Sequence, residues 1–488
     1  MTVPAGEVWH RPGEAWHRLS PRMLLVHPVH EVLRQIPLLI GSVVLGSATG
    51  SPVWTLFGLV LIVGYGMARW FTTTYRIDTE EVQLRTGVLE RKVLSVPRNR
   101  IRSVSTDARL LHRLLGLTVL RVSTGQQAKR DGAFALDAVE AAQVPRLRAI
   151  LLADSAGAEA SAPGRELARW RLSWLRYSPL SFTGLAMILA AAGLVYQAGA
   201  GAALQNSRIA RSGLDTAQRF GVVASVVVVA VAVVVLSAVL SVLRSLVTYG
   251  NLVLRRDADL LHLEHGLLRV REHTFDMRRL RGGTLREPLL VRLIGGARLD
   301  AVMTGVGARE ASLLLPACPR ATAEAVLSEL IARPDVVAGP LCAHGAVATR
   351  RRWTRALALP ALVLVAMVGL DPWTPVWLWP VWAVLAVCCA LLAFDRSRAL
   401  GHRVDAQWLV ARAGSMDRRR DCIAAAGIIG WTVRQTLLQR RAGVATLTAA
   451  TAAGVKGYRV IDVPAGLAWS IAAAASPWVA DNDWARTT

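Results

Sequence analysis

One eighteen-residue pattern occurs three times in this chain and constrains its fold more than any other feature. The stretch ARLLHRLLGLTVLRVSTG (108–125) recurs as EPLLVRLIGGARLDAVMT (287–304) and as QTLLQRRAGVATLTAATA (435–452). Each copy is typical of one apolar helical turn that a glycine ends, followed by a β-strand. The chain is therefore predicted to repeat one structural unit three times.

Landmark residues keep the same offsets, 179 and 327 residues, from the first copy to the second and third. They are Asp78, Asp257 and Asp405; Gly87, Gly266 and Gly414; Arg113, Arg292 and Arg440; and Gly116, Gly295 and Gly443. We expect the aspartates to bond to their own backbone in tight turns, and the glycines to adopt a positive φ. Two interpretations stay open for the arginines, which either bond to carbonyls near the turn or face the membrane.

The residues around these landmarks alternate between apolar and polar, as in YRIDTEEVQLRTGVLERKVLSVP (75–97). Such alternation, broken by Asp and Gly turns, predicts a meander of short antiparallel strands. An apolar helical stretch closes each copy. The unit is therefore expected to hold six or seven strands, curled into a small sandwich or barrel whose open end one helix covers.

Long apolar segments precede each copy. Residues 220–243 carry no charge and exceed the roughly 20 residues that a helix needs to cross a bilayer. Similar runs give three pairs, 36–49 with 53–70, 180–200 with 220–243, and 356–370 with 373–394, and so predict six membrane spans. The segments between the pairs are dense in arginine next to the spans. The positive-inside rule then places both termini and all three β-rich units in the cytoplasm, on a multi-pass protein of the cell membrane.

The turn aspartate, the hairpin glycine and the L-L-x-R-x-x-G turn before a strand together resemble the bacterial pleckstrin-homology-like (PH-like) membrane proteins with three PH-like domains. The resemblance covers the chain from residue 23 to about 475 and implies PH-like folds on a multi-pass anchor, without a catalytic set. It also implies a smaller PH-like membrane protein as a frequent partner. The third copy departs from the pattern, since Arg441 stands where the other copies have Leu114 and Leu293.

The expected fold is a multi-pass α-helical membrane protein with three cytoplasmic β-rich PH-like domains, each a curled antiparallel sheet or barrel with a C-terminal helix. The expected boundaries are 1–35 for an N-terminal segment, 36–70 for hairpin 1, 71–155 for PH-like domain 1, 156–179 for a linker with an interfacial helix, 180–243 for hairpin 2, 248–335 for PH-like domain 2, 336–355 for a basic linker, 356–394 for hairpin 3, 398–476 for a degenerate PH-like domain 3, and 477–488 for a tail.

Five arginines are the candidate binding residues. VPRNRIRSV (96–104) spaces Arg98, Arg100 and Arg102 at period two, which predicts that they share one face of a strand, and Arg279 and Arg281 match in the second copy. One interpretation is a cationic stripe that binds anionic lipid headgroups or an acidic partner. The other is an ordinary solvated strand face.

No enzyme signature is present. The sequence contains no GxSxG, P-loop, HExxH or dinucleotide-binding fingerprint, and its five cysteines form no CxxC pair, so we expect no catalytic residue, metal or cofactor. The net charge of +23 suits an anionic membrane surface better than nucleic acid in a chain with such spans. The predicted function is non-catalytic binding or scaffolding of protein partners, of anionic lipid headgroups or of further copies of the chain. A component of a transport or export system is the alternative.

Overall fold

The computed structural model describes residues 16–18, 53, 60, 64, 68, 71–78, 80–87, 91–98, 101, 103–108, 110–123, 134–152, 164–181, 183–197, 221–304, 312–370 and 373–480. The chain divides into two compact units. Unit 1 comprises 1–169, 250–279 and 305–307, and unit 2 comprises 170–249, 280–304 and 308–488. The division therefore runs through the second copy of the repeat.

Each repeat consists of two groups of three strands followed by a helix. Repeat 1 contains β2 (Thr74–Ile77), β3 (Glu81–Thr86), β4 (Lys92–Pro97), β5 (Ser103–Ala108), α4 (Leu110–Leu114), β6 (Leu117–Ser123), β7 (Phe134–Glu140), the 3-10 turn η2 (Ala141–Gln143) and α5 (Val144–Leu152). The helical turn and the strand after it lie where the sequence predicts them. The repeat itself has six strands.

Repeats 2 and 3 follow the same order. Repeat 2 contains β9 (Val253–Asp257), β10 (Leu260–His265), β11 (Val270–Asp276), η4 (Met277–Arg279), β12 (Leu280–Pro288), α10 (Leu289–Leu293), β13 (Gly296–Met303), β14 (Leu313–Pro319) and α11 (Arg320–Ile331), with the short α12 (Pro334–Ala338) after it. Repeat 3 contains β15 (Gly401–Val404), β16 (Trp408–Ala413), β17 (Asp417–Ala424), η5 (Ala425–Gly427), β18 (Ile428–Arg434), α15 (Leu437–Arg441), β19 (Val444–Thr451), β20 (Gly457–Pro464), η6 (Ala465–Leu467), α16 (Ala468–Ala475) and α17 (Pro477–Ala480). The short helices α12 and α17 extend past residues 335 and 476, where the ranges expected for PH-like domains 2 and 3 end.

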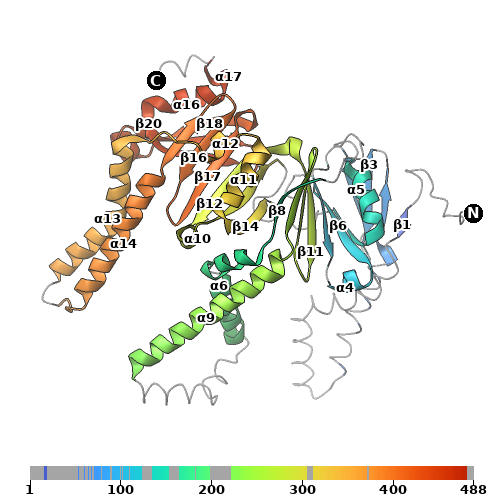
Figure 1. Ribbon diagram of the computed structural model, residues 1–488, viewed down its shortest axis with the longest axis horizontal. Helices are drawn as coiled ribbons and strands as arrows, with labels where there is room; N and C mark the ends of the chain where they lie inside the picture. Colours follow the sequence, from blue (N-terminus) through green and yellow to red (C-terminus); the bar gives the residue numbers. More distant parts are fainter. Residues whose placement is uncertain are drawn as a thin grey trace, which may run out of the picture. The chain divides into compact units, whose positions relative to one another are not determined.

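The two halves of one repeat belong to different sheets, which the sequence did not indicate. The last three strands of repeat 1 join the first three of repeat 2 in a seven-stranded sheet, β7-β6-β5-β11-β10-β9-β8. The last three strands of repeat 2 join the first three of repeat 3 in a six-stranded sheet, β14-β13-β12-β17-β16-β15 (Figure 1). Each sheet is antiparallel and spans two repeats.

A further short strand precedes each hairpin and pairs with the first strand of the following repeat. These pairings are β1 (His17–Arg18) with β2, β8 (Arg165–Arg169) with β9, and an isolated bridge between Cys342 and His402. The interfacial helix predicted within 156–179 is therefore wrong for Arg165–Arg169, which is a strand. The chain continues as the 3-10 helix η3 (Leu172–Leu180).

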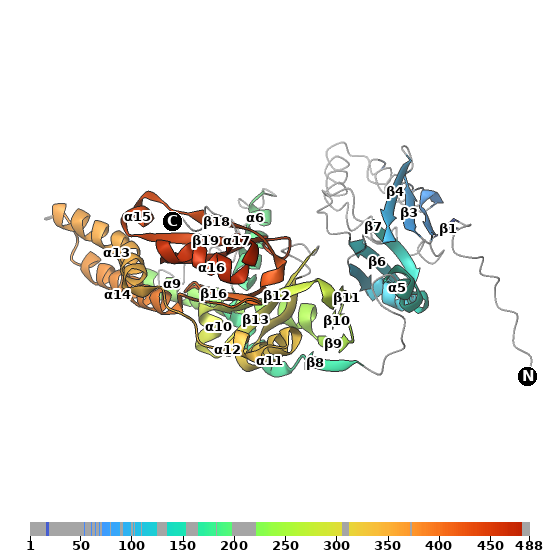
Figure 2. The same ribbon diagram turned by 90° about the horizontal axis from the view of Figure 1, so that it is seen from above.

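In repeats 1 and 3 an apolar core lies between the two halves of the repeat. In repeat 1, residues of β3 and β4 such as Val82 and Val96 pack with Leu120 of β6, Leu136 of β7 and Leu151 of α5. Repeat 3 has a similar core, which α16 covers by packing against β15 and β19 (Figure 2). The PH-like arrangement of two antiparallel sheet halves and one helix is thus present although the sheets continue into neighbouring repeats.

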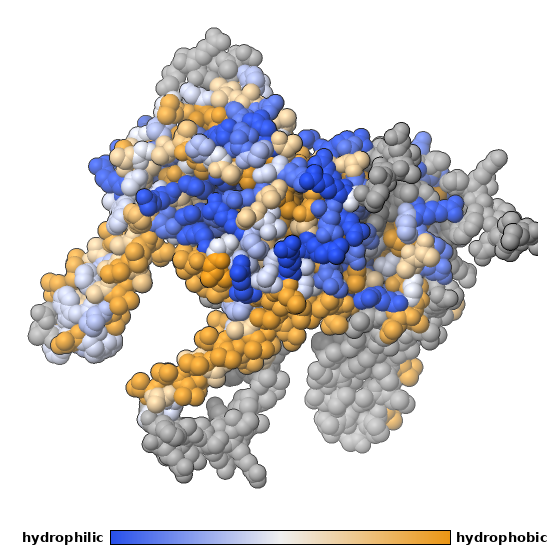
Figure 3. Space-filling view, in the orientation of Figure 1, coloured by the Kyte–Doolittle hydropathy of each residue, from blue (hydrophilic) through white to orange (hydrophobic). Residues whose placement is uncertain are grey.

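Three described helices are long and apolar enough to cross a membrane. They are Val223–Tyr249 within α9 (Val222–Tyr249), α13 (Gly345–Gly369) and α14 (Leu378–Ala399). Hydrophobic residues cover α9 and much of the α13–α14 hairpin (Figure 3). The helix α6 (Thr183–Gln197) is apolar but shorter, and hairpin 1 lies almost entirely outside the described residues. Six spans are therefore not confirmed.

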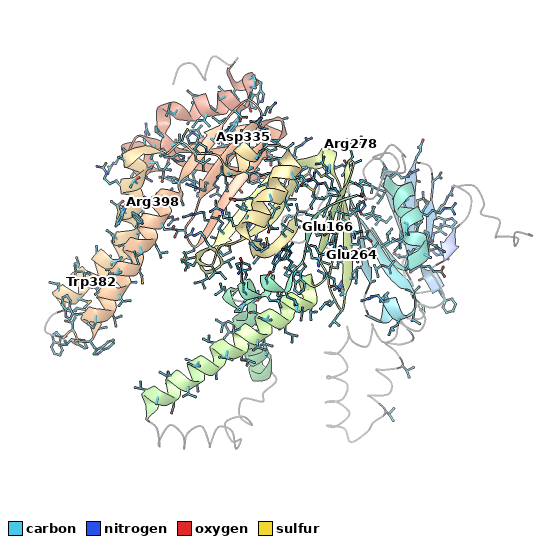
Figure 4. All side chains as sticks on the ribbon, viewed as in Figure 1. Glu166, Glu264, Arg278, Asp335, Trp382 and Arg398 are labelled. Carbon is cyan, nitrogen blue, oxygen red and sulfur yellow. The ribbon has the colours of Figure 1, made fainter. Side chains whose placement is uncertain are left out.

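Specific contacts join the two helices within hairpin 2, and others join the two helices within hairpin 3. A Cβ on Gly184 of α6 would lie 1.9 Å from the carbonyl oxygen of Ser237, so only glycine permits this approach to α9. In the third hairpin, Trp382 Nε1 donates to the Pro360 carbonyl at 2.9 Å. Trp382 lies towards the end of this hairpin that is far from the sheets, and Arg398 lies at the end beside them (Figure 4).

Candidate functional site at the shared sheet edges

Two strand pairings join consecutive repeats, and we call them the first and the second seam. In the first seam β5 pairs with β11, from Ala108 opposite Val270 to Ser103 opposite Phe275. In the second seam β12 pairs with β17, from Gly282 opposite Ile423 to Pro288 opposite Asp417. In both, the fourth strand of one repeat pairs antiparallel with the third strand of the next.

The two seams have the same register. A shift of 179 residues relates β5 of repeat 1 to its equivalent β12 in repeat 2. A shift of 148 residues relates β11 of repeat 2 to its equivalent β17 in repeat 3. Ser103 opposite Phe275 becomes Gly282 opposite Ile423 under these shifts, and that is the pairing observed. A slip by one residue would turn every side chain to the other face of the sheet, so a shared register indicates a specific interface.

A buried ion pair crosses the first seam. Arg269 donates two hydrogen bonds to the carboxylate of Asp107, which is 5% exposed, and Arg121 lies 3.7 Å from it. Burial alone would raise the pKa of Asp107, but hydrogen bonds and positive charge from Arg269 outweigh it and hold the pKa below its usual value. Beside this pair, Thr106 donates to Glu272 at 3.3 Å.

The second seam carries the same pair with its charges exchanged. Arg286 occupies the position of Asp107, and Asp417 that of Arg269; their side chains are 3.8 Å apart. Thr284 donates to Asp421 at 2.7 Å across this seam. Burial raises the pKa of Asp421 to about 6, although Thr284 and nearby arginines act in the opposite direction.

The landmark arginines also reach into the following repeat. Arg113 donates to the Leu267 carbonyl of repeat 2 at 3.1 Å, and Arg292 donates to Asp395 on α14 at 2.8 Å. Asp395 also accepts from Arg418 of repeat 3 at 2.6 Å. The expected carbonyl contact is thus present for Arg113, but it joins two repeats and does not hold the arginine's own turn. The last of these arginines, Arg440, is exposed.

The landmark glycines and Asp405 behave as the sequence predicts. Gly87, Gly266 and Gly414, and also Gly116, Gly295 and Gly443, all have a positive φ. Asp405 accepts hydrogen bonds from the backbone N–H groups of Gln407 and Trp408 at 2.9 and 2.7 Å, as expected of a turn aspartate. Asp78 instead pairs with Arg76 at 3.2 Å, and Asp257 lies 3.4 Å from the ring of His262.

Of the described members of the predicted arginine stripe, Arg98 and Arg279 lie in 3-10 turns and not on a strand face. Arg279 belongs to the 3-10 turn η4, where its guanidinium lies 3.4 Å from Asp276. Arg281 is the second residue of β12 and lies beside Gly427 of repeat 3. Arg98 follows the end of β4 in a 3-10 turn, and Arg100 and Arg102 lie outside the described residues. The period-two spacing therefore runs through a turn that interrupts the strands. Binding of lipid or partner by these arginines stays a prediction.

A cavity of about 410 Å³ opens at the C-terminal end of α9 in unit 2. Its wall is mainly apolar, and it includes the side chains of Tyr177, Ser241, Arg244, Tyr249 and Arg298. Tyr177 is buried and accepts a hydrogen bond from Arg176 at 2.7 Å, and Ser241 accepts from the backbone N–H of Gly184 at 2.9 Å. These contacts combine hydroxyl groups and arginines with an apolar wall, a combination that suits an amphipathic anion.

Buried polar residues also fix the foot of hairpin 3 to repeat 3. Asp462 is fully buried, lies 2.8 Å from Arg352 and 3.4 Å from Arg351, and accepts from Gln439 at 2.8 Å. Within the described part of the chain, no group of three or more His, Cys, Asp or Glu side chains could hold a metal ion. These polar contacts of Asp462 connect α13 with α15 and β20.

Sequence reasoning missed the residues that cross the seams. Asp107 and Arg269, and Arg286 and Asp417, are too far apart in sequence for a local pattern to pair them. One signal was available, because the members of each pair occupy equivalent positions in different repeats with their charges exchanged. An exchange of charge at both equivalent positions is what a contact between repeats predicts.

The Bacterial PH domain family model matches the chain three times, at residues 31–155, 212–333 and 356–473. Searches of curated proteins and of solved structures gave no match. Each of the three matches contains one β-rich repeat and apolar sequence before it, and together they cover more than half of the chain. The chain therefore belongs to the Bacterial PH domain family and carries three PH-like domains.

Proposed function

We propose that this protein is a non-catalytic, membrane-anchored scaffold whose PH-like domains bind protein partners through their sheet edges. The observation that carries the proposal is the pair of seams, in which strand edges of consecutive domains bind each other with one register. Strand addition to a sheet edge supplies backbone hydrogen bonds for affinity and alternate side chains for specificity. The strands β4 and β18, which end their sheets and are equivalent to seam strands, could therefore receive a strand from outside the chain.

The anchor is a set of apolar helices that carry the domains on one side of the membrane. Three candidate spans and the arginines at the foot of each described hairpin support this arrangement. The full proposal is six spans in the cell membrane, with both termini and all three domains in the cytoplasm, as the positive-inside rule predicts. A transport role remains the alternative function, and solute flux in proteoliposomes is the measurement that would favour it.

Site-specific photo-crosslinking in intact cells tests the scaffold. A photoreactive amino acid replaces Thr432, which is exposed on β18, and in a control chain it replaces Leu467, which is 53% exposed on η6. We expect a discrete protein adduct from position 432 and none from position 467. A second probe at Val93, which is 55% exposed on β4, should also give a discrete adduct. The absence of protein adducts from both strands would contradict the scaffold.

The cavity at the C-terminal end of α9 supports a second binding function, for an anionic phospholipid. Arg244 and Arg298 would bind the phosphate while the apolar wall receives part of an acyl chain. The test compares anionic lipid retained by the purified full chain with that retained by Arg244→Glu, Arg298→Glu and the control Arg459→Glu, whose arginine is exposed on β20. We expect a loss of bound lipid in the first two variants only. Equal retention in all of them would exclude this site.

A further inference from the structure

The two outermost strands of the repeat series have no neighbour on one side in the described structure. β4 ends the sheet β1-β2-β3-β4, and β18 ends the sheet β18-β19-β20. β4 is the third strand of its repeat, equivalent to β11 and β17, and β18 is the fourth strand of its repeat, equivalent to β5 and β12. Each chain therefore presents one copy of both edges that pair in the seams.

The exposed residues on these edges are the counterparts of residues that the seams bury. Thr284 is 6% exposed in the second seam, whereas its equivalent Thr432 in β18 is exposed. On the opposite edge, Cys422 of β17 is fully buried, whereas its equivalent Ser95 in β4 is exposed. The difference in burial is the one expected if the strand that covers a seam is missing at both ends of the series.

The fourth strand of repeat 3 keeps the backbone features of the strand that forms the second seam. β12 has a register shift between Leu280 and Gly282 against β13, and β18 has the same shift between Ile428 and Gly430 against β19. The interior glycine differs in its surroundings and in its backbone, because Gly282 has a positive φ and Gly430 does not. A Cβ on Gly282 would meet the Cys422 carbonyl oxygen at 1.9 Å, whereas one on Gly430 would find its nearest atom at 3.9 Å.

Charge at the end of β18 follows the pattern of the second seam. Arg286 lies opposite Arg419 there, and Asp417 lies 3.8 Å from the first and 2.9 Å from the second. The equivalent residues in the sequence are Arg434 in repeat 3 and Lys92 and Glu90 in repeat 1. Glu90 lies outside the described residues. Arg440, the exposed equivalent of Arg113 and Arg292, is a further side chain suited to contact a following repeat.

We propose that β18 of one molecule pairs antiparallel with β4 of a second copy of this chain, in the register of the two seams. The shifts between repeats then place Gly430 opposite Val96, Val433 opposite Val93 and Arg434 opposite Lys92. This inference rests on the proposed scaffold function and names the partner that the edges take. The contact is head to tail, so it joins copies in a ring if the rotation closes and in an open series if it does not.

Disulfide trapping between two tagged full-length chains tests this register. One chain carries Val433→Cys and the other Val93→Cys, each with Cys342, Cys388 and Cys389 replaced by serine, because these three are not buried. The chains are produced together and oxidised in their own membrane. Residues directly opposite in a sheet meet the distance requirement of a disulfide, so we expect at least about tenfold more mixed dimer than from a control that pairs Leu467→Cys with Val93→Cys.

Because the two cysteines are on different molecules, pairing of β18 with β4 inside one chain gives no mixed dimer and would overturn the proposal. An equal yield from the control would overturn it as well. The mass of the unsubstituted chain in nanodiscs, which depends on no substitution, should correspond to two or more copies, and a monomer would refute the inference. If photo-crosslinking from Thr432 captures a different protein, the inference fails while the scaffold function stands. If neither edge gives any adduct, both fail.

Discussion

The first seam and the second seam align the same strands with the same register, yet they hold different side chains. His273 of β11 and Asp421 of β17 occupy equivalent positions, opposite Ser105 and Thr284. The ion pair beside them is Asp107 with Arg269 in one seam and Asp417 with Arg286 in the other. Backbone pairing therefore fixes how repeats join, and complementary side chains can be exchanged without a change of register.

The seams differ also in how closely the backbones approach. Gly282 has a φ of 136° and touches the backbone of Cys422, whereas the first seam has Ser103 at this position. Glycine reaches such a φ without steric cost, and other residues rarely do. The second seam thus depends on one glycine that the first seam does not need.

The largest expected effect comes from filling that contact. Gly282→Val should weaken the second seam by about 3 kcal/mol or more, because the new Cβ meets a carbonyl oxygen at 1.9 Å and valine disfavours a positive φ. The comparison variant is Gly430→Val in β18, where φ is not positive and the nearest atom within one chain is at 3.9 Å; in chains dispersed as monomers by detergent its effect should stay within about 0.5 kcal/mol, because no second copy then covers β18. Hydrogen exchange of the β12 and β18 amides measures both, and equal losses would show that the close approach is unimportant.

A smaller effect should separate the two ion pairs. Asp107→Asn removes the carboxylate that pairs with Arg269, and because Asp107 is 5% exposed it should cost about 2 kcal/mol in the first seam. Asp417→Asn should cost less than about 1 kcal/mol, because the side chain of Asp417 is 36% exposed.

The double variant Asp107→Arg with Arg269→Asp reproduces the polarity of the second seam. It should recover most of the loss that Asp107→Arg causes alone. Hydrogen exchange in β5 gives the readout, and no recovery would mean that the exchange of charges between seams reflects chance.

The smallest effect is a response to acid that should have opposite signs in the two seams. Burial, helped by positive charge at His265 and Arg271, lowers the pKa of His273 to about 4. When the first seam is open, the His273 imidazole therefore binds a proton below about pH 6.5 that it does not bind when the seam is closed. The first seam consequently loses stability as the pH falls. The pKa of Asp421 is raised to about 6, so the closed second seam takes up the proton first and gains stability as the pH falls through 6.

Between pH 7 and pH 5, each change should amount to about 1 kcal/mol. Hydrogen exchange corrected for its intrinsic pH dependence can follow β11 and β17 in one sample. His273→Gln and Asp421→Asn should each remove the response of their own seam only. Changes of the same sign in both seams would contradict the assignment.

Local features of this fold could be predicted from the sequence because local chemistry determines them. The turn α4 and the strand β6 follow from an apolar turn and a glycine, and the landmark glycines have the expected positive φ. The pairing of strands could not be predicted in this way, because a strand of alternating apolar and polar residues can pair within its own repeat or with a strand of the next repeat. The sharing of sheets was therefore missed.

The errors in the candidate site have a similar origin. Alternating arginines around residue 98 predicted a continuous strand, but a 3-10 turn interrupts it at η4 in the second repeat. The arginines and tryptophans of 166–182 suggested an interfacial helix, yet Arg165–Arg169 pairs with β9. Both patterns depend only on neighbouring residues. Neither contains information on the long-range hydrogen bonds that determine which conformation forms.

The division of the seven-stranded and six-stranded sheets between neighbouring repeats bears on how such a chain can change its length. Each repeat offers a fourth-strand edge to its successor and a third-strand edge to its predecessor. Tandem duplication of the gene segment for one repeat and its hairpin would therefore insert a link that fits both neighbours. Proteins of this kind can lengthen or shorten during evolution without inventing a new contact surface.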